Sequence, residues 1–275
     1  MIEVKNVVKT FDGFAALNDA TLSVPTGAVY GLVGPNGAGK TTAFNVITGV
    51  YQPTNGAVWF EGRKIIENTP HGKMKKLYKG QNASKYSHII APTPDKITQM
   101  GIARTFQNIR LWKSQTVFEN VLIAKHMRAR QNVFSAAFRL NRAEEKRMRE
   151  EAMSLLEEQN LAHLKDEVAG SLPYGAQRRL EIVRALATNP SLLLLDEPAA
   201  GMNPSETAEL MENIRRIRDT FQIAILLIEH DMNLVMGICE GICVLNFGRI
   251  IAKGTPDEIR NNPQVIEAYL GKKEG

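Results

Sequence analysis

The sequence is poor in cysteine and has no long apolar run. Its 275 residues include two cysteines, Cys239 and Cys243, which are too few for a disulfide framework and have no second pair of ligands nearby for a zinc site. We expect both to be buried free thiols. No apolar run approaches the roughly 18 residues of a membrane span, and residues 1–4 begin a strand-like pattern rather than a signal segment. These absences predict a cytoplasmic protein.

Charge of one sign is not in large excess either. The chain has 34 Lys and Arg against 29 Asp and Glu, and a net charge of +5 is compatible with contact to nucleic acid, to a membrane surface or to nothing in particular. Hydrophobic residues make up 44% of the chain, enough for a sizeable core. Length alone permits one large domain or two small ones, so motifs must indicate the function.

A glycine-rich segment, residues 34–42 (GPNGAGKTT), carries the strongest signal. It matches the pattern G-x-x-x-x-G-K-[ST] and lies between an apolar run, residues 29–33, and a helical pattern, residues 43–48. The alternative is a glycine-rich turn that only connects a strand to a helix, but such a turn does not require the whole pattern. The segment therefore predicts a P-loop and a nucleoside triphosphate site.

The residue types of this loop suit a triphosphate. Glycines allow backbone N–H groups at a helix N-terminus to approach the phosphate oxygens without side-chain clashes. Lys40 is expected to reach the β- and γ-phosphates, the Thr41 hydroxyl to coordinate Mg²⁺, and Thr42 to hydrogen-bond a phosphate. The predicted nucleotide-binding residues of the loop are Gly34, Asn36, Gly37, Ala38, Gly39, Lys40, Thr41 and Thr42.

The residues around this loop favour β-structure. Apolar positions alternate over residues 1–33, turn signals stand at residues 12–13 and 25–27, and a further hairpin is predicted near residues 53–62. Phe11 precedes the first turn. It is either a core residue or an aromatic placed to stack on a purine ring.

Residues 69–94 lose this regularity. Lysines stand there among small and polar residues with no acidic partner. We expect a mobile, basic surface insertion at about residues 70–93, either a solvated loop or a contact for anionic lipid headgroups or nucleic acid. The lysines are Lys73, Lys75, Lys76, Lys79 and Lys85.

Helical spacing follows the insertion. Residues 117–130 and 143–158 each carry an apolar stripe, and Asn141 with Glu144 matches a capping box for the second helix. This part of the chain is predicted to form a helical subdomain.

Two apolar runs predict buried strands. Residues 192–195 and 223–228 are continuous apolar runs, as is typical of strands buried on both faces of a parallel sheet. Between them, Asn203 and Glu206 form a capping box for a helix; after them, residues 243–252 are predicted to form a hairpin. Alternating strands and helices predict an α/β layer fold, and the lack of an internal repeat indicates one nucleotide unit.

Acidic residues follow the first of these strands. Asp196 and Glu197 are expected at the carboxyl edge of the sheet, where ligands of open α/β folds bind, and residues 229–231 reach the same edge. Asp196 suits Mg²⁺ binding through water, Glu197 could activate the water that attacks the γ-phosphate, and His230 could hydrogen-bond that phosphate. An Asp-Glu pair alone is more often a surface feature, but its place after a buried strand and a P-loop favours catalysis.

Together these motifs resemble the ATP-binding cassette (ABC) ATPases over nearly the whole chain and in the family's order. The corresponding motifs are Walker A at residues 34–42, the Q-loop at Gln107, the signature at residues 172–176, Walker B at residues 192–197, the D-loop at residues 200–203 and the switch histidine His230. The resemblance implies that Phe11 stacks on adenine, that Tyr174 and Gly175 contact nucleotide, and that Gln107 joins Thr41 and Asp196 at Mg²⁺.

The resemblance also implies an architecture. It is a single ABC ATPase domain over residues 1–275, with a P-loop parallel-sheet core, an antiparallel β subdomain and an α-helical subdomain. The core with the β subdomain would take residues 1–108 and 181–275. The helical subdomain, at about residues 109–180, would contain the signature.

More narrowly, residues 103–108, 174–182 and 254–271 resemble the branched-chain amino-acid uptake cassettes. This implies the ATP-hydrolysing, energy-coupling subunit of an importer, with ATP and Mg²⁺ as cofactors, peripheral on the cytoplasmic face of the inner (plasma) membrane. The implied partners are membrane permease subunits, a second ABC ATPase subunit in a heterodimer or a homodimer and, indirectly, a periplasmic or external solute-binding protein, with no nucleic acid. ATP would lie between one subunit's P-loop and the other's signature.

The signature departs from the family pattern at two positions. Pro173 replaces the usual serine and offers neither a hydroxyl nor an N–H, and Ala176 stands where a glutamine is common. We expect the composite site that uses this signature to be weaker than the site built from Lys40 and a partner's signature.

Three points stay open from the sequence. A lipopolysaccharide-export cassette shares most of these motifs. A soluble ABC ATPase acting on nucleic acid or ribosomes is a further alternative, although that class usually has two fused cassettes or long coiled-coil arms. Leu111, Trp112 and Val117 either line a permease groove or belong to the core.

Overall fold

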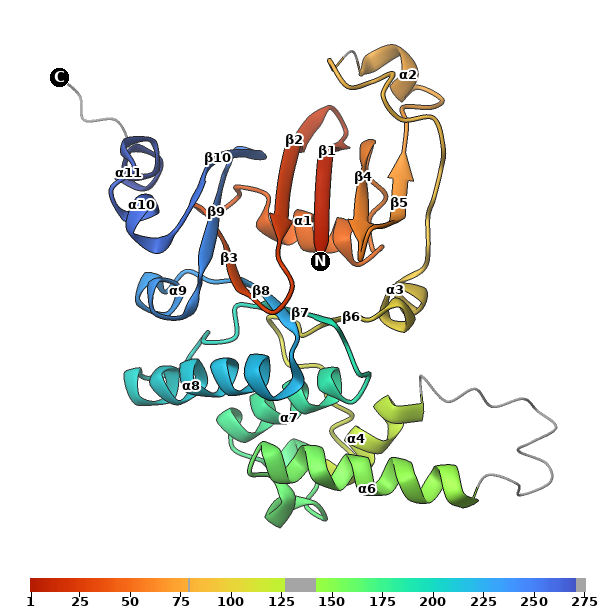
Figure 1. Ribbon diagram of the computed structural model, residues 1–275, viewed down its shortest axis with the longest axis vertical. Helices are drawn as coiled ribbons and strands as arrows, with labels where there is room; N and C mark the ends of the chain where they lie inside the picture. The colour runs from red at the N-terminus through yellow and green to blue at the C-terminus, as the bar shows by residue number, and fades with distance from the viewer. Residues whose placement is uncertain (79, 127–141, 271–275) are drawn as a thin grey trace.

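The computed structural model describes residues 1–78, 80–126 and 142–270 and contains two β-sheets with helices packed around them (Figure 1). One sheet has the order β10 (Arg249–Gly254), β9 (Gly241–Asn246), β3 (Val29–Val33), β8 (Ala224–Ile228), β7 (Leu192–Asp196) and β6 (Ile102–Arg104). The other has the order β2 (Phe14–Val24), β1 (Ile2–Phe11), β4 (Asn55–Phe60) and β5 (Arg63–Asn68).

The two sheets differ in strand direction. All neighbours in the six-stranded sheet are parallel except β9 and β10, whereas every pair in the four-stranded sheet is antiparallel. The predicted fold class is therefore confirmed: a parallel-sheet core, an antiparallel sheet and helices. The predicted strand at residues 29–33 agrees with β3, and the second buried strand begins one residue later than predicted, at Ala224.

Ten helices and two short 3₁₀ turns lie in the described residues. The helices are α1 (Lys40–Ile47), α2 (Met74–Leu77), α3 (Pro94–Met100), α4 (Val117–His126), α6 (Arg142–Glu158), α7 (Tyr174–Leu186), α8 (Pro204–Phe221), α9 (Met232–Ile238), α10 (Pro256–Arg260) and α11 (Pro263–Leu270). The 3₁₀ turns are η1 (Ala162–Leu164) and η2 (Ala169–Ser171). In Figure 1, α4, α6, α7 and α8 lie on the side of the six-stranded sheet away from β1 and β2.

The central strands of the six-stranded sheet are buried on both faces. Side chains of a strand alternate between faces, so Leu193 and Leu195 pack with α4, α6, α7 and α8, whereas Leu192 and Leu194 pack with α1 and the four-stranded sheet. All five residues of β7 and all five of β8 are buried. This is why both strands could be recognised as continuous apolar runs.

Side-chain caps fix the start of α8. The Asn203 side chain accepts from the Glu206 N–H while the Glu206 carboxylate accepts from the Asn203 N–H, which confirms the predicted capping box. The helix predicted at residues 117–130 corresponds to α4 as far as His126. Residues 127–130, and Asn141 of the second predicted capping box, lie outside the described residues.

The basic insertion is more ordered than predicted. It contains α2, and Tyr86 is buried with its hydroxyl donating to the Asn6 side chain at 2.9 Å. Its later part pairs with β5, because Glu67 and Ile90 exchange main-chain hydrogen bonds and the buried Glu67 carboxylate accepts from the main chain at residues 87–88. These contacts of residues 86–90 were not predicted, because one buried aromatic and a single bridge leave no periodic pattern in the sequence. The mobility of the loop stays a prediction. Lys79 lies outside the described residues.

Cys239 and Cys243 are free and buried, as predicted. Within the described ranges, no helix combines the length and the apolarity that a bilayer crossing requires.

Candidate active site

The P-loop connects β3 to α1 and is held by close backbone contacts. At Gly34, φ is +153° and a Cβ atom would lie 2.0 Å from the Leu245 carbonyl oxygen of β9. At Gly39, φ is +106° and a Cβ atom would lie 2.3 Å from the Ala16 carbonyl oxygen of β2. Only glycine fits these two positions, so the loop is wedged between both sheets.

Lys40 is a buried cation at the first position of α1. Its side chain is 6% exposed, and Nζ donates to the carbonyl oxygens of Gly34 at 2.7 Å and Pro35 at 3.0 Å. Burial lowers the pKa of Lys40, and the charges of Glu197 and Asp196 oppose this shift. A buried ammonium bonded to neutral carbonyls suits an incoming phosphate.

The residues beside Lys40 fit a nucleotide with Mg²⁺. Asn36, Gly37 and Thr41 are exposed at the mouth of the loop, and the Thr41 hydroxyl and the Asp196 carboxylate are the hard oxygen donors that Mg²⁺ prefers. In the described part of the chain, no cluster of three or more His, Cys, Asp or Glu offers a metal site made of protein alone.

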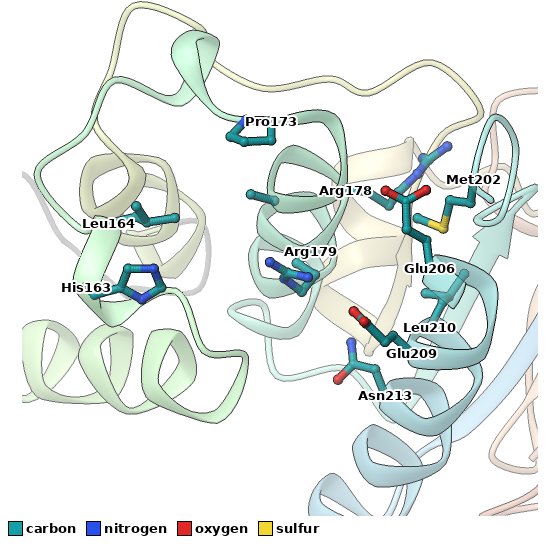
Figure 2. Close-up of a pocket in the computed structure, with 12 residues that line it drawn as sticks. His163, Leu164, Pro173, Arg178, Arg179, Met202, Glu206, Glu209, Leu210 and Asn213 are labelled. Atoms are coloured by element: carbon teal, nitrogen blue, oxygen red, sulfur yellow. The ribbon is translucent and has the colours of Figure 1, made fainter. Parts of the chain in front are cut away.

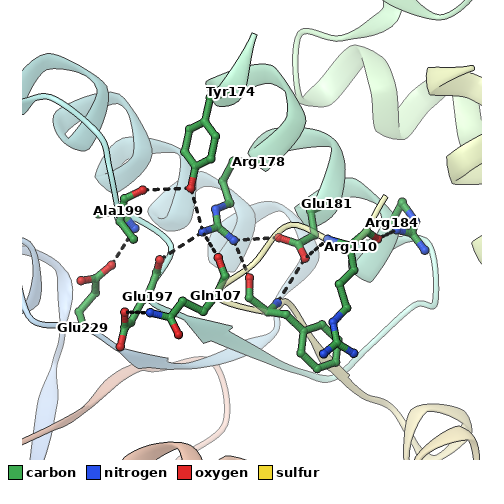
Figure 3. Close-up of polar contacts among 11 residues, drawn as sticks. Gln107, Arg110, Tyr174, Arg178, Glu181, Arg184, Glu197, Ala199 and Glu229 are labelled. Atoms are coloured by element: carbon green, nitrogen blue, oxygen red, sulfur yellow. Dashed lines mark hydrogen bonds and ion pairs between the residues drawn. The ribbon is translucent and has the colours of Figure 1, made fainter. Parts of the chain in front are cut away.

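Glu197 lies at the centre of the predicted catalytic residues. Gln107 Nε2 donates to its Oε2 at 2.7 Å (Figure 3), and His230 Nε2 lies 3.0 Å from its Oε1. The backbone of Glu197 has φ of +49°, an uncommon conformation for a residue with a side chain. The structure therefore brings Gln107, Glu197 and His230 together from three separate segments.

Asp196 is engaged by a residue that the sequence did not single out. Arg104 Nη2 lies 2.7 Å from Asp196 Oδ2, and both side chains are 6% exposed. Arg104 Nη1 also donates to Asn45 Oδ1 at 2.7 Å. Arg104 thus connects β6, β7 and α1 behind the P-loop, and its position on a short strand just before Gln107 was the only signal.

Glu229 is a second residue whose role the sequence did not indicate. It is 4% exposed and accepts from the main-chain N–H groups of Ala199 at 2.7 Å and His230 at 3.0 Å. Burial raises the pKa of its carboxyl group. The one hint in the sequence was its position, between a buried strand and His230. The structure shows that it holds the main chain just before the D-loop.

The signature begins α7 without a side-chain cap. Pro173 is the N-cap residue and provides no capping hydrogen bond, as its lack of a hydroxyl predicts. The Tyr174 hydroxyl donates to the Ala200 carbonyl oxygen at 3.0 Å. Gly175 faces open space, since a Cβ atom added there would meet nothing within 4 Å.

A hollow of about 430 Å³ lies beside this first turn, between α7 and α8. Pro173, Gly175 and Ala176 line it from the signature side. Figure 2 shows Arg179 of α7 facing Glu209 and Asn213 of α8 across the hollow. Pro173, Tyr174 and Gly175 are therefore accessible to another molecule, whereas Leu172 and Ala176 are buried in the core of this chain.

The apolar candidates divide between surface and core. Phe11 is 39% exposed and packs edge-to-face on Tyr51 with ring centroids 5.3 Å apart, while Lys9 Nζ lies 4.9 Å from its ring centroid. Phe11 is therefore not a core residue. Trp112 is 41% exposed, whereas Val117 is wholly buried, so the groove reading is wrong for Val117 because it faces the core beneath α4.

Comparison with known proteins agrees with this arrangement. A family model described as "ABC transporter" matches residues 17–200. The chain belongs to the ABC transporter family. A second family model, described as "Branched-chain amino acid ATP-binding cassette transporter", matches residues 249–274.

Relatives in this ABC family match over nearly the whole chain. The chain is 42% identical to the high-affinity branched-chain amino acid transport ATP-binding protein BraF of Pseudomonas aeruginosa, over 99% of the chain and 98% of that protein. It is 42% identical to the protein of the same description, LivG, of Escherichia coli, with the same coverage. The crystal structure of the ADP conformation of MJ1267, an ATP-binding cassette of an ABC transporter, has a TM-score of 0.79 at 32% identity and covers 99% of both chains.

The chain is thus an ATP-binding ABC ATPase, as the motifs predicted. The structure adds three positioning contacts to the predicted site: Arg104 on Asp196, Glu229 on the main chain of Ala199 and His230, and Arg178 on the main chain of Gln107.

Proposed function

We propose that this chain is the ATP-hydrolysing, energy-coupling subunit of an ABC importer for branched-chain amino acids, peripheral on the cytoplasmic face of the membrane. The observation that carries the proposal is the 42% identity to BraF and LivG over 99% of the chain. The match of residues 249–274 to the branched-chain amino acid cassette model also supports the proposal. This match does not depend on the P-loop, because it lies at the opposite end of the chain.

Glu197 is the proposed general base. Its carboxylate is held between Gln107 and His230, which suits it to orient and polarise the water that attacks the γ-phosphate. His230 is placed to hydrogen-bond the γ-phosphate as charge develops there. When bound, Mg²⁺ supplies charge neutralisation at the phosphates, and Thr41, Asp196 and Gln107 are the residues proposed to hold it.

Nucleotide is proposed to bind at the interface of two cassettes. The open N-terminus of α7 presents main-chain N–H groups and the positive end of the helix dipole, which favour a γ-phosphate that ADP lacks. In this chain that helix end borders a hollow instead of its own P-loop. We propose a heterodimer, with a homodimer as the alternative, in which each signature completes the partner's site.

The proposed permease contact lies on the side of α7 away from that hollow. A groove of about 250 Å³ runs between β6, α4 and α7 and is lined by Phe106, Arg110 and Arg184. Beside it, Arg184 lies 4.0 Å from the ring centroid of the exposed Trp112. We also propose the division that the resemblance implies, into a core of residues 1–108 and 181–275 and a helical subdomain of about residues 109–180; residues of both parts line the groove.

A direct test is purification of the chain from native membranes under mild detergent. The proposal expects two permease subunits and a second cassette to co-purify in fixed ratio, with a branched-chain amino acid binding protein encoded or recovered alongside. Recovery of a lipopolysaccharide-export permease would contradict the import assignment. Recovery without any membrane protein, together with ATPase stimulation by DNA or RNA, would contradict the transport role.

A further inference from the structure

Charged residues on one face of α7 hold the segment that carries Gln107. Arg178, Glu181 and Arg184 recur at every third position, and helical residues three apart share a face. Figure 3 shows all three pointing toward the segment 106–110. The signature helix and the Q-loop are therefore joined by side chains along two helical turns.

Arg178 makes the central contacts of this set. It is completely buried, and Nη1 donates to the Phe106 carbonyl oxygen at 2.7 Å and to Glu181 Oε2 at 2.9 Å. Nη2 donates to the Gln107 carbonyl oxygen at 3.0 Å. Longer contacts of 3.4 Å join Nη2 to the Tyr174 hydroxyl and the Glu197 carbonyl oxygen.

Glu181 completes the attachment from the other side of the ion pair. It is 4% exposed, and Oε1 accepts from the main-chain N–H groups of Phe106 at 3.3 Å and Arg110 at 3.2 Å. Both main-chain polar groups of Phe106, the residue before Gln107, are thus bound by the Arg178–Glu181 pair. Arg184 adds a hydrogen bond to the Arg110 carbonyl oxygen.

Stability alone is a weak reason for such a pair. A buried ion pair loses the hydration of both charges, and apolar residues of similar volume often replace such pairs at no cost. What apolar residues cannot replace is the set of directed hydrogen bonds to the main chain on both sides of Gln107. Those bonds fix the main chain at Gln107, whose side chain donates to Glu197 at 2.7 Å.

We propose that Arg178 and Glu181 are positioning residues for hydrolysis. They make the Q-loop and the first two turns of the signature helix one unit, so that Gln107 reaches the Glu197 carboxylate when α7 is in place. The inference rests on the proposed function, in which Glu197 is the general base and the N-terminus of α7 meets nucleotide on the partner cassette. The N-terminus of α7 contacts the nucleotide of one composite site, and Glu197 belongs to the other. The Arg178–Glu181 pair thereby links the position of the signature helix in the first site to the position of the catalytic carboxylate in the second.

The test uses Arg178→Met combined with Glu181→Met, which removes both charges and leaves neither buried alone. In the purified transporter complex, with the partner cassette's catalytic carboxylate replaced by an amide, turnover reports the site that contains Glu197. We expect the ATP dissociation constant to stay within about twofold and kcat to fall about tenfold or more, because misplaced catalytic groups act on the chemical step. Hydrogen exchange at the Phe106 and Arg110 amides should rise, while exchange in β3 and β7 should not.

The matched control is Lys125→Met combined with Glu151→Met. This ion pair, at 2.8 Å, joins α4 to α6 and touches none of the site residues, so kcat should stay near that of the parent complex. Arg178→Lys alone keeps the charge but not the two-pronged geometry, and it should give an intermediate kcat.

Parental kcat and unchanged exchange at residues 106 and 110 in the Met–Met variant would overturn the inference. If that variant does not fold, parental kcat in Arg178→Lys would overturn it equally. Failure of the proposed function would give a different result, because Glu197→Gln would then retain hydrolysis whether or not Arg178 is substituted.

Discussion

At the residue scale, Glu197 combines an uncommon backbone conformation with two side-chain hydrogen bonds. A non-glycine residue at positive φ costs roughly 1–3 kcal/mol and persists where its surroundings fix it. Here the Glu197 N–H donates to the Ile228 carbonyl oxygen at 2.9 Å, so the end of β8 holds the backbone in place. This conformation directs the carboxylate between Gln107 and His230.

The first prediction concerns that carboxylate. Glu197→Gln keeps the shape of the side chain but cannot take a proton, so ATP affinity should change little while turnover falls about 10²-fold or more. Phosphate release and nucleotide binding by the same preparation measure the two effects. Glu212→Gln, an exposed carboxylate on α8, is the control and should match the parent. Normal hydrolysis by Glu197→Gln would remove the general-base assignment.

The second prediction separates binding from chemistry. Lys40→Ala removes a buried ammonium proposed to meet the β- and γ-phosphates, so ATP affinity itself should fall by about tenfold or more, since charge-assisted bonds to phosphate are strong. Equilibrium binding of a fluorescent ATP analogue measures this. Lys96→Ala, an exposed lysine on α3, serves as the matched control. Retained affinity in Lys40→Ala would show that Lys40 does not contact the phosphates.

The third prediction concerns the two thiols. Burial raises the pKa of Cys239 to about 12 and that of Cys243 to about 11. Because folding raises both values above the ordinary thiol value of 9.0, the stability associated with neutral thiols is fully present below about pH 9. It is lost progressively as the pH rises from there through about 11 to 12. At pH 8 the native thiols should resist an alkylating reagent that labels the urea-unfolded chain fully, as mass spectrometry can show. Rapid double labelling of the native protein would contradict their burial.

At the scale of elements, the start of α7 is unusual because its N-cap residue, Pro173, makes no side-chain capping hydrogen bond. A serine as the N-cap residue would accept a hydrogen bond from the first helical turn and provide a hydroxyl to a phosphate, and Pro173 does neither. The composite site that uses this signature should therefore hydrolyse ATP more slowly than it would with a serine at position 173.

The fourth prediction follows from that helix start. Pro173→Ser should raise ATP turnover of the assembled complex by about twofold or more, because one phosphate contact is regained. Steady-state turnover measured where the chemical step limits the rate is the readout. The same rate in both forms would mean that the missing hydroxyl does not weaken the site.

Sequence periodicity revealed the elements but not the contacts between them. β7 and β8 were predictable because both faces are buried and every residue is apolar, and α8 was predictable because Asn203 and Glu206 are local to its start. The Arg104–Asp196 and Arg178–Phe106 contacts join residues 92 and 72 positions apart. A charged residue inside a helix or a strand is most often solvated, so no local pattern marks such pairs. The anchored insertion escaped prediction for the same reason.

At the scale of the whole molecule, the order of the strands in the six-stranded sheet brings the site residues together. β3, β8 and β7 are neighbours in the sheet, and they deliver the P-loop, His230 and Glu197 to one edge. The Arg178–Glu181 pair (Figure 3) lies on α7, one of the helices on the side of the six-stranded sheet away from β1 and β2 (Figure 1). Hydrolysis at the sheet edge can thereby be coupled to the groove beside Trp112, where a permease is proposed to dock.

The fifth prediction tests the central claim, that ATP hydrolysis by this chain drives import of branched-chain amino acids. The measurement is uptake of radiolabelled leucine by the complete transporter in proteoliposomes, with a leucine-loaded binding protein on the outer side and ATP on the cassette side. The account predicts accumulation that requires ATP and is lost when Glu197→Gln is introduced into this chain. Leucine accumulation that persists with Glu197→Gln, or ATP hydrolysis with no accumulation of leucine, isoleucine or valine, would contradict it.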